Sequence, residues 1–573
     1  MSLQDPYSGK PWLKFYDKHV PPSLNYPGKT FVELFLDAVE AVPGKTLVNY
    51  MGASLSFREL DELSNRFANF LKARGLKPGD VVGVNLPNLP AYYIAIIGIL
   101  RAGCLLSGVS PLLSAKEMEY QLNDSGAKVL LTLDLLSDKA AEALTRTGVK
   151  SMVVVEIADF LPAVKRVLGK LLKKIPTKPV PPVPGKEVIR FMDILKTMPS
   201  TPVLESIGVS APCLMQYTGG TTGPSKGAVL THRNMVCQIT QFGVWVDLKM
   251  GQGTLLSAFP LFHQAGLFIG MMAMAYGCTQ IAIPNPRDVD FIIAAIKKHK
   301  PNAIGNVPTI FMELMKKEAF RKLDFSWLEW CGSGAAPFPP EYIKEFEDIV
   351  GKGKLVEVFG MTETSPITTA LPFYGKKVPG SVGIPLPDTE AKLVDPETGS
   401  VVPVGEPGEF VAKGPQVFTI GYHEKPEETA NTLRDGWIYT GDICQMDENG
   451  YFYVVDRMKD MVNISGFKVF TRQVDDVLME HPDIDMAATI GLPDPARPGS
   501  EIVVSALVLK PGRDKSEAMR EKIGQYMKEK VAPYKVPKRI EFMDQLPTSG
   551  VGKILKRELR EMLSKRREEE AKP

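Results

Sequence analysis

Cysteine is scarce in this sequence, and its few positions are far apart. The chain contains 6 cysteines among 573 residues. None of them forms a C-x-x-C pair or stands beside histidines at the spacing of a zinc site. The pattern excludes a disulfide scaffold and favours a reducing compartment, so we expect a cytoplasmic protein.

An excess of charge of one sign is also lacking. Lysine and arginine together number 68, aspartate and glutamate 66, and 44% of the residues are hydrophobic. Nucleic-acid-binding proteins and disordered tails usually carry a strong net charge. We therefore expect a globular chain that has no nucleic-acid partner.

Long hydrophobic runs are absent as well. The first residues, MSLQDPYSGKPW, lack the apolar core of a signal peptide, and the longest apolar run extends only from Tyr92 to Leu100. A helix that crosses a bilayer needs about 20 apolar residues. We expect no transmembrane segment.

Strand and helix patterns alternate along most of the chain. Ser56 and Glu59 predict a capping box that begins a helix. Further predicted elements are a helix at Ala91–Leu100 and strands at Val81–Leu86, Val153–Val155 and Gln280–Ile283. This alternation is typical of parallel α/β layers. Because 573 residues exceed what one core usually supports, we expect at least two domains.

A change of composition places the domain boundary near residue 456. From Asp456 onward the chain is rich in lysine and holds a compact set of strand and helix patterns, which ends in a basic helix at Lys553–Arg567. The polar segment 456–460 lies between two apolar strand-like runs, as expected of a hinge. We predict an N-terminal domain of residues 1–456 and a C-terminal domain of residues 457–573.

A basic stretch between Phe160 and Arg190 leaves two interpretations open. Apolar residues recur in it at helical spacing, at Leu161, Val164, Val167, Leu168, Leu171 and Leu172. The segment 160–186 is either an interfacial helix in weak peripheral contact with anionic lipid or a surface helix followed by a linker. From the sequence we favour the surface helix.

The segment from Tyr217 to Gly227, YTGGTTGPSKG, has the composition of a phosphate-binding loop. Glycines let backbone N–H groups turn toward an anion, hydroxyl groups add donors, and Lys226 adds positive charge. The P-loop of NTPases requires serine or threonine directly after its lysine, but here Gly227 follows Lys226. A P-loop ATPase or kinase, which would release ADP, is therefore disfavoured.

Five further motifs follow this loop, namely Phe359–Glu363 (FGMTE), Tyr439–Asp442 (YTGD), Asp456–Asp460 (DRMKD), Ser465–Lys468 (SGFK) and Leu546–Lys553 (LPTSGVGK). In order and spacing, the six motifs resemble those of the adenylate-forming superfamily of acyl-CoA synthetases, luciferases and peptide-synthetase adenylation domains. The likeness is greatest to bacterial and archaeal long-chain-fatty-acid–CoA ligases, which segments such as Asn285–Asp288 and Pro385–Lys392 also resemble.

The resemblance implies an α/β fold with a large N-terminal domain of layered sheets and helices and a small, mobile α+β C-terminal lid. It implies a ligase that converts a carboxylate and ATP into an acyl-adenylate and pyrophosphate, and then passes the acyl group to coenzyme A with release of AMP. ATP, Mg²⁺ and coenzyme A would be needed, and a medium- to long-chain fatty acid would be the substrate. The formation of a homodimer is left open.

Residue roles follow from the same resemblance. ATP and AMP would be bound by Thr218, Gly219, Gly220, Thr221, Thr222, Gly223, Lys226, Gly332, Gly334, Ala335, Ala336, Pro337, Phe359, Gly360, Thr362, Asp442 and Arg457. Glu363 would hold Mg²⁺, and Thr362 would contact the α-phosphate. Phe359 would stack on the adenine where most relatives carry tyrosine, which keeps the ring but loses a hydroxyl.

Lys553 matches the lysine that bridges the carboxylate and phosphate oxygens in the family. The lid then rotates about a hinge, at the position of Lys459, and brings the strand with Ser465, Gly466, Phe467 and Lys468 to the site of thioester formation. This implies that Lys553→Ala abolishes adenylate formation but spares thioester formation from supplied acyl-adenylate. It also implies that Gly466→Leu blocks thioester formation while pyrophosphate release continues.

The substrate class is inferred from the motif Phe259–His263 (FPLFH). His263 would border the acyl and pantetheine sites as a catalytic residue, although a buried structural histidine would look the same. Amino-acid-activating relatives carry an aspartate beside this motif, so an amino acid is disfavoured. Free coenzyme A is the expected acceptor, because too few residues follow Lys553 for a carrier domain.

Candidate residues of the acyl pocket are Phe242, Val244, Trp245, Phe268, Met271 and Met272. A packed core would have the same apolar composition. Two alternatives remain, namely an aryl, branched-chain or short-chain acyl-CoA ligase on the same fold and a non-catalytic homologue that binds acyl groups or nucleotides.

Overall fold

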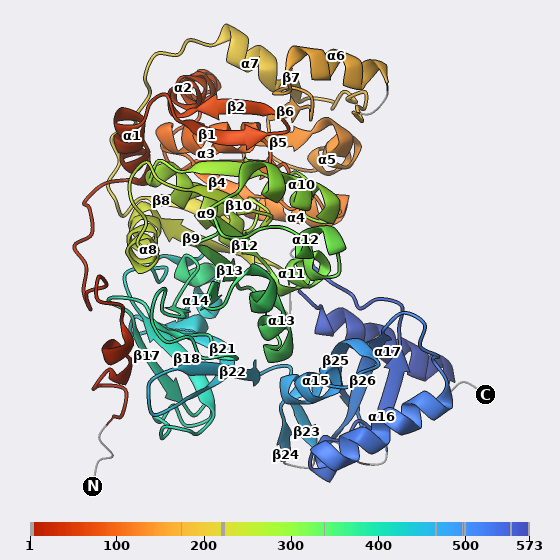
Figure 1. The fold of residues 1–573 in the computed structure, drawn as a ribbon. Helices are drawn as coiled ribbons and strands as arrows, with labels where there is room; N and C mark the ends of the chain where they lie inside the picture. Colours follow the sequence, from red (N-terminus) through yellow and green to blue (C-terminus); the bar gives the residue numbers. More distant parts are fainter. Residues whose placement is uncertain are drawn as a thin grey trace.

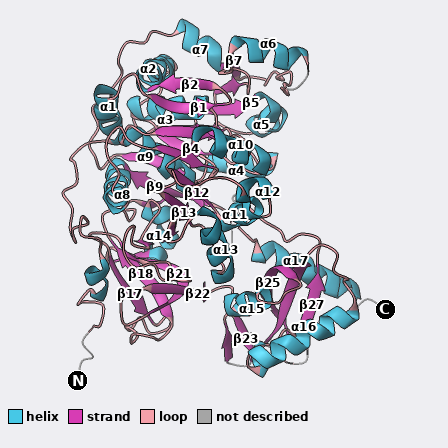
Figure 2. Ribbon diagram, in the orientation of Figure 1, coloured by secondary structure: helices cyan, strands magenta, loops and turns pink. Residues whose placement is uncertain are grey.

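The computed structural model describes residues 5–172, 175–218, 224–336, 338–464, 467–495, 497, 500–549 and 553–570. These residues form a large N-terminal part and a small C-terminal part (Figure 1). Layers of strands carry helices on their faces (Figure 2). The expected α/β fold with a small α+β domain at its C-terminal end is confirmed.

An eight-stranded sheet has the strand order β19-β9-β8-β4-β3-β5-β6-β7. The strands from β8 to β7 run parallel, whereas β8, β9 and β19 pair antiparallel. Its members are β3 (Val81–Asn85), β4 (Leu105–Gly108), β5 (Val129–Leu133), β6 (Ser151–Val155), β7 (Glu187–Arg190), β8 (Pro212–Thr218), β9 (Lys226–Thr231) and β19 (Gly421–Tyr422). The central strands are mostly apolar and fully buried because helices cover both faces.

A nine-stranded sheet has the order β16-β15-β14-β13-β12-β10-β11-β1-β2 and is parallel from β14 to β1. Its members are β1 (Thr46–Tyr50), β2 (Ala53–Ser56), β10 (Thr254–Ser257), β11 (Thr279–Ala282), β12 (Ala303–Asn306), β13 (Trp330–Ser333), β14 (Leu355–Phe359), β15 (Thr369–Ala370) and β16 (Ile384–Pro385). The predicted strands at 81–86, 153–155 and 280–283 are therefore confirmed to within two residues as β3, β6 and β11.

The helices of the N-terminal part flank these sheets. They are α1 (Phe31–Ala41), α2 (Phe57–Ala73), α3 (Pro90–Arg101), α4 (Ala115–Asp124), α5 (Ser137–Leu144), α6 (Ala163–Leu171), α7 (Phe191–Thr197), α8 (His232–Trp245), α9 (Gln264–Ala275), α10 (Val289–His299), α11 (Pro308–Met315), α12 (Glu318–Arg321), α13 (Pro340–Val350) and α14 (Pro426–Thr432). Short 3₁₀ turns occur at Pro11–Phe15, Asp134–Leu136, Thr362–Thr364 and Pro533–Lys535. Helix α3, predicted at 91–100, is buried on every side, which explains its uniformly apolar sequence.

The predicted capping box is also confirmed. The Ser56 hydroxyl accepts the N–H of Glu59 at 3.2 Å, and the Glu59 carboxylate accepts the N–H of Ser56 at 2.7 Å. Both contacts satisfy backbone donors that have no partner within the first turn of α2. The sequence therefore specified where this helix begins.

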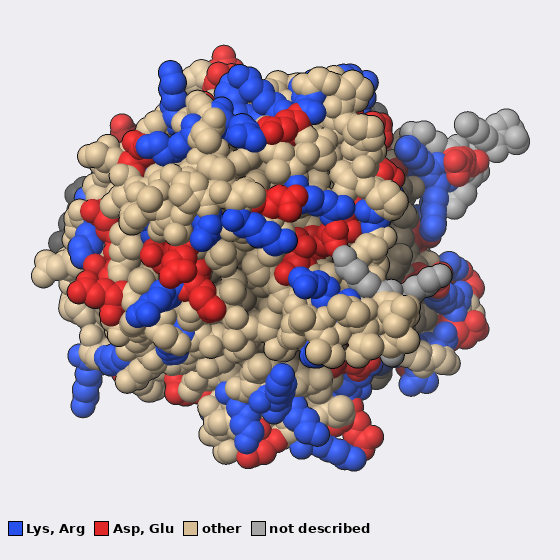
Figure 3. Space-filling view, turned by 90° about the horizontal axis from the view of Figure 1, so that it is seen from above, with Lys and Arg blue, Asp and Glu red and all other residues tan. Residues whose placement is uncertain are grey.

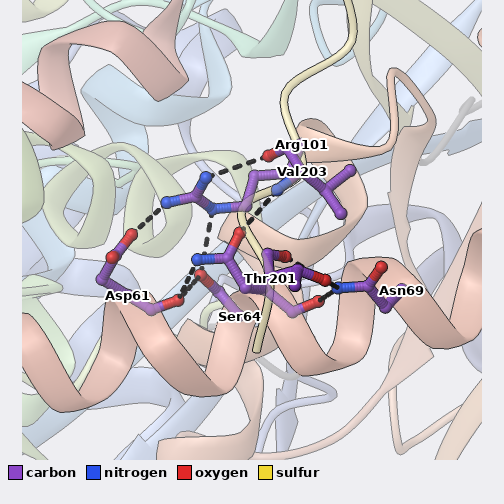
Figure 4. A network of polar contacts seen from close by, with 7 residues as sticks. Asp61, Ser64, Asn69, Arg101, Thr201 and Val203 are labelled. Carbon is purple, nitrogen blue, oxygen red and sulfur yellow. Dashed lines mark hydrogen bonds and ion pairs between the residues drawn. The ribbon is translucent and has the colours of Figure 1, made fainter. Parts of the chain in front are cut away.

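A buried arginine joins α2 and α3 to the segment that leads into β8 (Figure 4). The Arg101 side chain, only 2% exposed, pairs with Asp61 and donates to the Ser64 hydroxyl at 3.1 Å and to the Val203 carbonyl at 3.0 Å. Asn69 holds the same segment by donating to the Thr201 carbonyl at 2.9 Å. The network fixes the chain just before the strand that carries the glycine-rich loop.

A third, antiparallel sheet leads to the small C-terminal part. Its order is β17-β18-β21-β20, with β22 paired to β21, and its members are β17 (Glu390–Val394), β18 (Gly408–Lys413), β20 (Leu433–Arg434), β21 (Trp437–Met446) and β22 (Phe452–Arg457). Strand β22 ends at Arg457, and residues 458–460 form a turn. The chain then leaves the N-terminal part.

The C-terminal part combines two small sheets with three helices. Its elements are β23 (Val462–Ile464), β24 (Phe467–Val469), α15 (Thr471–Met479), β25 (Ile484–Pro493), β26 (Glu501–Leu509), α16 (Glu517–Lys530), β27 (Arg539–Phe542) and α17 (Lys556–Glu570). The prediction that the last helix begins at Lys553 is wrong, because Lys553 lies in an extended segment before α17. No helix of the described residues is long and apolar enough to cross a membrane.

Candidate active site

The glycine-rich loop joins two strands of one antiparallel hairpin. Strands β8 and β9 pair down to Thr218 and Lys226, and the Thr218 hydroxyl lies 3.5 Å from the Lys226 carbonyl. Gly219, Gly220, Thr221, Thr222 and Gly223 lie outside the described residues. The structure therefore defines the base of the loop, with Thr218 and Lys226 facing each other across it.

Glu363 lies at the base of this loop and is almost completely buried. The Tyr422 hydroxyl donates to its carboxylate, and the Lys226 amine lies 4.9 Å from the centre of the Tyr422 ring. Burial raises the pKa of Glu363, while the hydrogen bond from Tyr422 and the charges of Arg457 and Lys226 oppose this rise. One buried carboxylate thus lies within the electrostatic influence of two cationic side chains, Arg457 and Lys226.

Asp442 and Arg457 form an ion pair between adjacent strands. They are directly paired residues of β21 and β22, and the Arg457 Nε atom lies 3.0 Å from the Asp442 carboxylate. The Asp442 side chain is 5% exposed. Arg457 therefore balances the charge of Asp442 and fixes the direction of its carboxylate.

Lys553 reaches this site from the C-terminal part on a small hairpin. The Ser549 hydroxyl accepts the N–H of Lys553 at 3.1 Å, the Lys553 carbonyl accepts the N–H of Ser549 at 2.8 Å, and Thr548 pairs with Ile554. Burial and the nearby charge of Arg457 lower the pKa of the Lys553 amine to about 8, although Asp442 partly offsets the effect. A cation from one part of the chain is thus held beside an ion pair of the other.

These groups line one cavity of about 240 Å³ between the two parts of the chain. Of the predicted nucleotide-site residues, those on its wall are Ala335, Ala336, Phe359, Gly360, Asp442, Arg457 and Lys553. Residues of the C-terminal part, among them Arg472 and Lys556, complete the wall. The structure therefore brings motifs from four distant segments together.

A second, apolar cavity of about 110 Å³ lies next to the first. Its predicted wall residues are Phe242, His263, Phe268, Met272, Gly332, Gly334 and Thr362. Ala335, Phe359 and Gly360 line both cavities. The Phe359 ring, which packs edge-on against Phe410, thus stands where the polar and the apolar cavities meet.

Close packing at this junction requires small residues. A Cβ atom on Gly360 would lie 2.0 Å from the Pro366 carbonyl oxygen, and one on Gly334 would lie 2.7 Å from a methyl group of Val358. Ala335 adopts the left-handed backbone region with φ of 67°, which is uncommon for a residue other than glycine. The loop after β13 is held tightly against β14.

His263 caps the first turn of α9 at the wall of the apolar cavity. Its Nδ1 atom accepts the N–H of Ala265 at 3.3 Å. Burial, together with the positive charge of Lys553, lowers the pKa of His263 to about 4. The imidazole is therefore neutral near pH 7, and its Nε2–H group is left to donate.

Three of the predicted acyl-pocket residues do not line this cavity. The Trp245 indole donates to the Leu371 carbonyl at 2.9 Å, and Met271 is fully buried in the core. Val244 is half-buried, and its carbonyl contacts His19. The prediction is wrong for these three, because α8 and α9 bury apolar side chains on several sides and only some of them face the cavity.

Of the predicted residues of the thioester step that the structure describes, none is on the wall of either cavity, although the charges of Lys459 and Lys553 act on each other. Lys459 is exposed in the turn 458–460, and the Lys468 amine contacts Glu397 at 3.1 Å on the surface. Phe467 belongs to β24. Ser465 and Gly466, like Pro337 of the loop after β13, lie outside the described residues.

Several groups at the site were not predicted from the sequence. Tyr422 contacts Glu363 only because β19 pairs with β9, and no local pattern indicates that pairing. Glu357, on β14, lines the larger cavity, and burial raises the pKa of its carboxyl to about 8, although the charge of Arg472 opposes the rise. Both residues are single positions without a motif around them.

A buried polar cluster connects the end of β22 to the C-terminal helices. The Asp456 carboxylate accepts the backbone N–H and the hydroxyl of Thr471, at the start of α15. The Lys556 amine donates to the Thr471 hydroxyl and to the Asp475 carboxylate, at 2.8 Å each. The cluster ties Asp456, near the end of β22, to the C-terminal part.

The donor set suits a magnesium ion that arrives with a polyphosphate. Within the described ranges, no group of three or more His, Cys, Asp or Glu side chains is arranged to hold a metal by itself. Mg²⁺ is usually bound by one or two carboxylates, water and substrate phosphates. Glu363, a single buried carboxylate near Lys226 at the base of the glycine-rich loop, fits that pattern.

Comparison with known proteins shows which family the chain resembles. The chain matches the family described as AMP-binding enzyme over residues 35–423 and the AMP-binding enzyme C-terminal domain over residues 473–553. It is 38% identical over 563 residues to a long-chain-fatty-acid–CoA ligase of Bacillus subtilis (strain 168), covering 97% of this chain and 98% of the relative. A ligase of the same description from Escherichia coli O6:H1 is 35% identical over 559 residues, covering 96% and 98%.

A solved structure shares the arrangement of both parts. The crystal structure of the anthranilate CoA ligase AuaEII in complex with anthranoyl-AMP has a TM-score of 0.82 and 25% sequence identity, and it covers 94% of this chain and 98% of that one. The match includes the small C-terminal part as well as the layered sheets.

Proposed function

The chain belongs to the AMP-binding enzyme family, as an AMP-forming acyl-CoA ligase, and we propose that it activates medium- to long-chain fatty acids. The acid's carboxylate attacks the α-phosphorus of ATP, and pyrophosphate leaves. The thiol of coenzyme A then attacks the acyl carbonyl, and AMP leaves as acyl-CoA forms. The enzyme uses ATP, Mg²⁺ and coenzyme A.

The observation that carries this proposal is the position of Lys553. Its amine lies on the wall of the cavity that Asp442 and Arg457 also line, and its charge acts on His263 in the apolar cavity. A cation at the boundary between a polar and an apolar cavity is suited to bring a carboxylate and a phosphate together. Two anions would otherwise repel each other.

The other site residues bind the nucleotide and Mg²⁺. Asp442, held by Arg457, accepts hydrogen bonds from the ribose hydroxyls, and Phe359 stacks on the adenine. The loop from Thr218 to Lys226 cradles the phosphates, and Thr362 contacts the α-phosphate. Glu363 binds Mg²⁺, and a bound magnesium ion would neutralise phosphate charge.

The composition of the apolar cavity favours a substrate with an unsubstituted hydrocarbon tail. Its described wall residues include no aspartate, glutamate, lysine or arginine, and His263 is the one ionisable side chain among them. An amino-acid ammonium group would therefore find no partner of opposite charge there. The relatives named as long-chain-fatty-acid–CoA ligases agree with a fatty acid substrate.

The domain division and the compartment are part of the same proposal. Residues 1–456 bind AMP and the acyl group, and residues 457–573 act as a lid that turns at Lys459 after adenylation. The turn would bring Gly466 and its neighbours to the thioester site. A cytoplasmic location suits the six cysteines, which are all free and buried.

The test measures AMP release across straight-chain acids from acetate to stearate, together with benzoate and ferulate, each with and without coenzyme A. We expect the highest kcat/KM for medium and long chains, and AMP as product. Lys553→Ala should abolish pyrophosphate release with every acid but retain thioester formation from supplied acyl-adenylate. A preference for benzoate or ferulate would identify an aryl ligase instead, and ADP as product would exclude the family's reaction.

A further inference from the structure

The outer face of the molecule shown in Figure 3 carries charges of both signs. Lys and Arg side chains are interspersed there with Asp and Glu side chains. This mixture is usual for protein surfaces and does not favour a partner of one charge. The interior of the N-terminal part gives a clearer indication, because the walls of the apolar cavity follow the register of the nine-stranded sheet.

The apolar cavity extends along the strands of this sheet, from their carboxyl ends toward their amino ends. His263 and Thr362 line it beyond the carboxyl ends of β10 and β14. Leu255, Ala303 and Trp330, which also line it, are paired residues near the amino ends of β10, β12 and β13. In the proposed reaction the carboxylate lies near Thr362, so the tail of the acid points toward this second group of residues.

Two glycines make room for the cavity in the middle of the sheet. Gly305 and Gly332 are paired residues of β12 and β13, and both line the cavity. Trp330 lies two positions before Gly332, so both residues point to the same face of the sheet. A Cβ atom on Gly332 would lie 3.0 Å from the six-membered ring of the Trp330 indole. The indole thus leans over Gly332, toward the carboxyl end of β13, and occupies part of the space that the glycines leave.

The dimensions of the cavity limit the tail that fits. Its volume is about 110 Å³, whereas an apolar cavity of about 150 Å³ holds one benzene molecule. Strand β13 has 4 residues and is therefore about 13 Å long, at about 3.3 Å per residue. An extended alkyl chain with C–C bonds of about 1.5 Å advances about 1.3 Å per carbon. A tail of about six to ten carbons thus reaches the Trp330 ring.

Ring contacts, rather than a hydrogen bond, hold the Trp330 indole in place. Its ring centre lies 6.0 Å from that of Phe242 and 6.2 Å from that of Phe373, both in edge-to-face arrangement. In the described part of the chain the Trp330 indole N–H has no hydrogen-bond partner, whereas that of Trp245 has one. Phe373 in turn contacts Tyr374, which is 67% exposed. A tail that displaced the indole would therefore follow aromatic rings toward the surface.

We propose that Trp330 is a specificity-determining residue, which sets the length of the acyl tail that the cavity takes without rearrangement. A medium-length tail ends at the indole, and a longer tail enters only when the indole turns aside. A smaller side chain at this position would continue the space above Gly305 and Gly332 along the strands, and longer acids would then fit. The inference rests on the proposed function, since it assumes that the apolar cavity holds the hydrocarbon tail of a fatty acid.

Chain-length profiles of AMP release, with coenzyme A present, test this assignment. Trp330→Ala should raise the ratio of kcat/KM for palmitate to kcat/KM for octanoate at least about tenfold, since two further methylenes in apolar surroundings account for about that factor. Trp330→Phe, which keeps a ring between Phe242 and Phe373, should raise the ratio by less. Trp327→Ala is the matched control, because Trp327 packs against Phe325 and lines neither of the two cavities, so its ratio should equal that of the wild type.

Tryptophan fluorescence locates the end of the tail without turnover. The probe is an acyl-sulfamoyl adenosine, a stable analogue of the acyl-adenylate, with bromine on the last carbon of an octanoyl tail. Bromine quenches the fluorescence of an indole that it contacts, so the saturated wild type should be quenched. Trp330→Phe, saturated with the same probe, should lose most of this quenching, because its four remaining tryptophans lie elsewhere in the chain.

The outcomes separate this inference from the proposed function. An unchanged ratio in Trp330→Ala, an equal rise in Trp327→Ala, or equal quenching of the wild type and Trp330→Phe would overturn the role of Trp330 alone. If circular dichroism shows that Trp330→Ala does not fold, the ratio and the quenching of Trp330→Phe decide. A wild type that releases AMP with no acid would overturn the proposed function, and this inference with it.

Discussion

At the residue scale, the charge of the Lys553 amine on the cavity wall depends on pH. Its pKa is lowered to about 8 by burial and by Arg457. The amine is cationic below that pH and neutral above it, so kcat/KM of the free enzyme for adenylation should fall as the pH rises through about 8. Pyrophosphate release between about pH 6.5 and 9.5 measures this profile.

Lys553→Arg is the control for the fall in kcat/KM above about pH 8, because a guanidinium stays charged between about pH 6.5 and 9.5. Its activity will be lower, but its profile should lack the fall above pH 8. Thioester formation from supplied acyl-adenylate should not show this fall above pH 8 in either protein. A wild-type adenylation profile that stays flat from about pH 7 to 9.5 would contradict the charged role of Lys553.

Tyr422 favours the ionised form of Glu363. Its hydroxyl donates to the Glu363 carboxylate and thereby opposes the increase in pKa that burial causes. Tyr422→Phe keeps the ring near Lys226 but removes this donor, so the pKa of Glu363 should rise further. Since a carboxylate binds Mg²⁺ only when ionised, the Mg²⁺ concentration for half-maximal adenylation should increase about tenfold, as expected for a hydrogen bond to a charged group.

In Tyr422→Phe, the loss of adenylation activity at low pH should also occur at a higher pH than in the wild type. Tyr453→Phe is a matched control, since Tyr453 donates to another carboxylate, that of Asp447, at 3.2 Å. Neither Tyr453 nor Asp447 lines the described walls of the two cavities. Equal Mg²⁺ requirements in Tyr422→Phe and the wild type would show that Glu363 does not hold the metal.

At the element scale, Arg101 is the link between α2, α3 and the segment before β8. Replacing it with methionine removes the partner of Asp61 and leaves the Val203 carbonyl without its donor. Breaking a buried ion pair typically costs about 3 kcal/mol. Arg101→Met should therefore lower the thermal midpoint by several degrees, as measured by circular dichroism.

Lys72→Met, on α2, is the comparison for a surface ion pair. Lys72 pairs with Glu205 at the surface, where the two side chains are 47% and 27% exposed. An exposed pair contributes less than about 1 kcal/mol, so this variant should shift the midpoint little. If the two substitutions lowered the midpoint equally, the burial of Arg101 would not be what makes its network stabilising.

Elements that depend on local pattern were predictable from the sequence, whereas long-range pairings were not. The capping box of α2 and the strand β3 are specified by neighbouring residues. The contact of Tyr422 with Glu363 depends on β19 meeting β9 across the fold. The start of α17 was missed because Lys553 is held in an extended segment by Ser549, through tertiary geometry that lysine-rich sequence does not indicate.

The candidate site likewise contains features that were predictable from the sequence and features that were not. Asp442 and Arg457 lie on adjacent strands of one hairpin, so motifs near in sequence were also near in space. Along α8, however, Phe242 lines the apolar cavity and Trp245, one turn later, packs in the core. Both are large apolar residues of one buried helix, and composition cannot distinguish a cavity wall from a core contact.

At the scale of the whole molecule, the larger cavity exists only because the two parts of the chain meet. Phe359 and Asp442 come from the N-terminal part and Lys553 from the C-terminal part. If Lys553 acts in adenylation, as proposed, the contacts between the parts belong to the orientation that favours this step. One such contact is the ion pair between Lys316, directly after α11, and Asp485, on β25, at 3.2 Å.

Weakening that pair should change the balance between the two half-reactions. If the lid turns after adenylation, Lys316→Asp disfavours the orientation seen here by placing two carboxylates face to face. Because Lys316 is half-exposed, the effect should stay below about 1 kcal/mol, or roughly two- to fivefold. Pyrophosphate release should slow by that factor, whereas thioester formation from supplied acyl-adenylate should stay equal or become faster.

Two further variants distinguish a shift of the lid from a general loss of activity. Lys316→Asp combined with Asp485→Lys restores opposite charges across the interface and should recover most of the pyrophosphate release. Lys317→Asp makes the same change at the next residue, but Lys317 pairs with Asp290 inside the N-terminal part, so both half-reactions should stay near wild type. Parallel loss of both half-reactions in Lys316→Asp, or no recovery in the exchanged pair, would show that the interface does not set the lid orientation. Because neither Lys316 nor Lys317 lines the two cavities, the comparison of Lys316→Asp with Lys317→Asp separates the rotation from the chemistry.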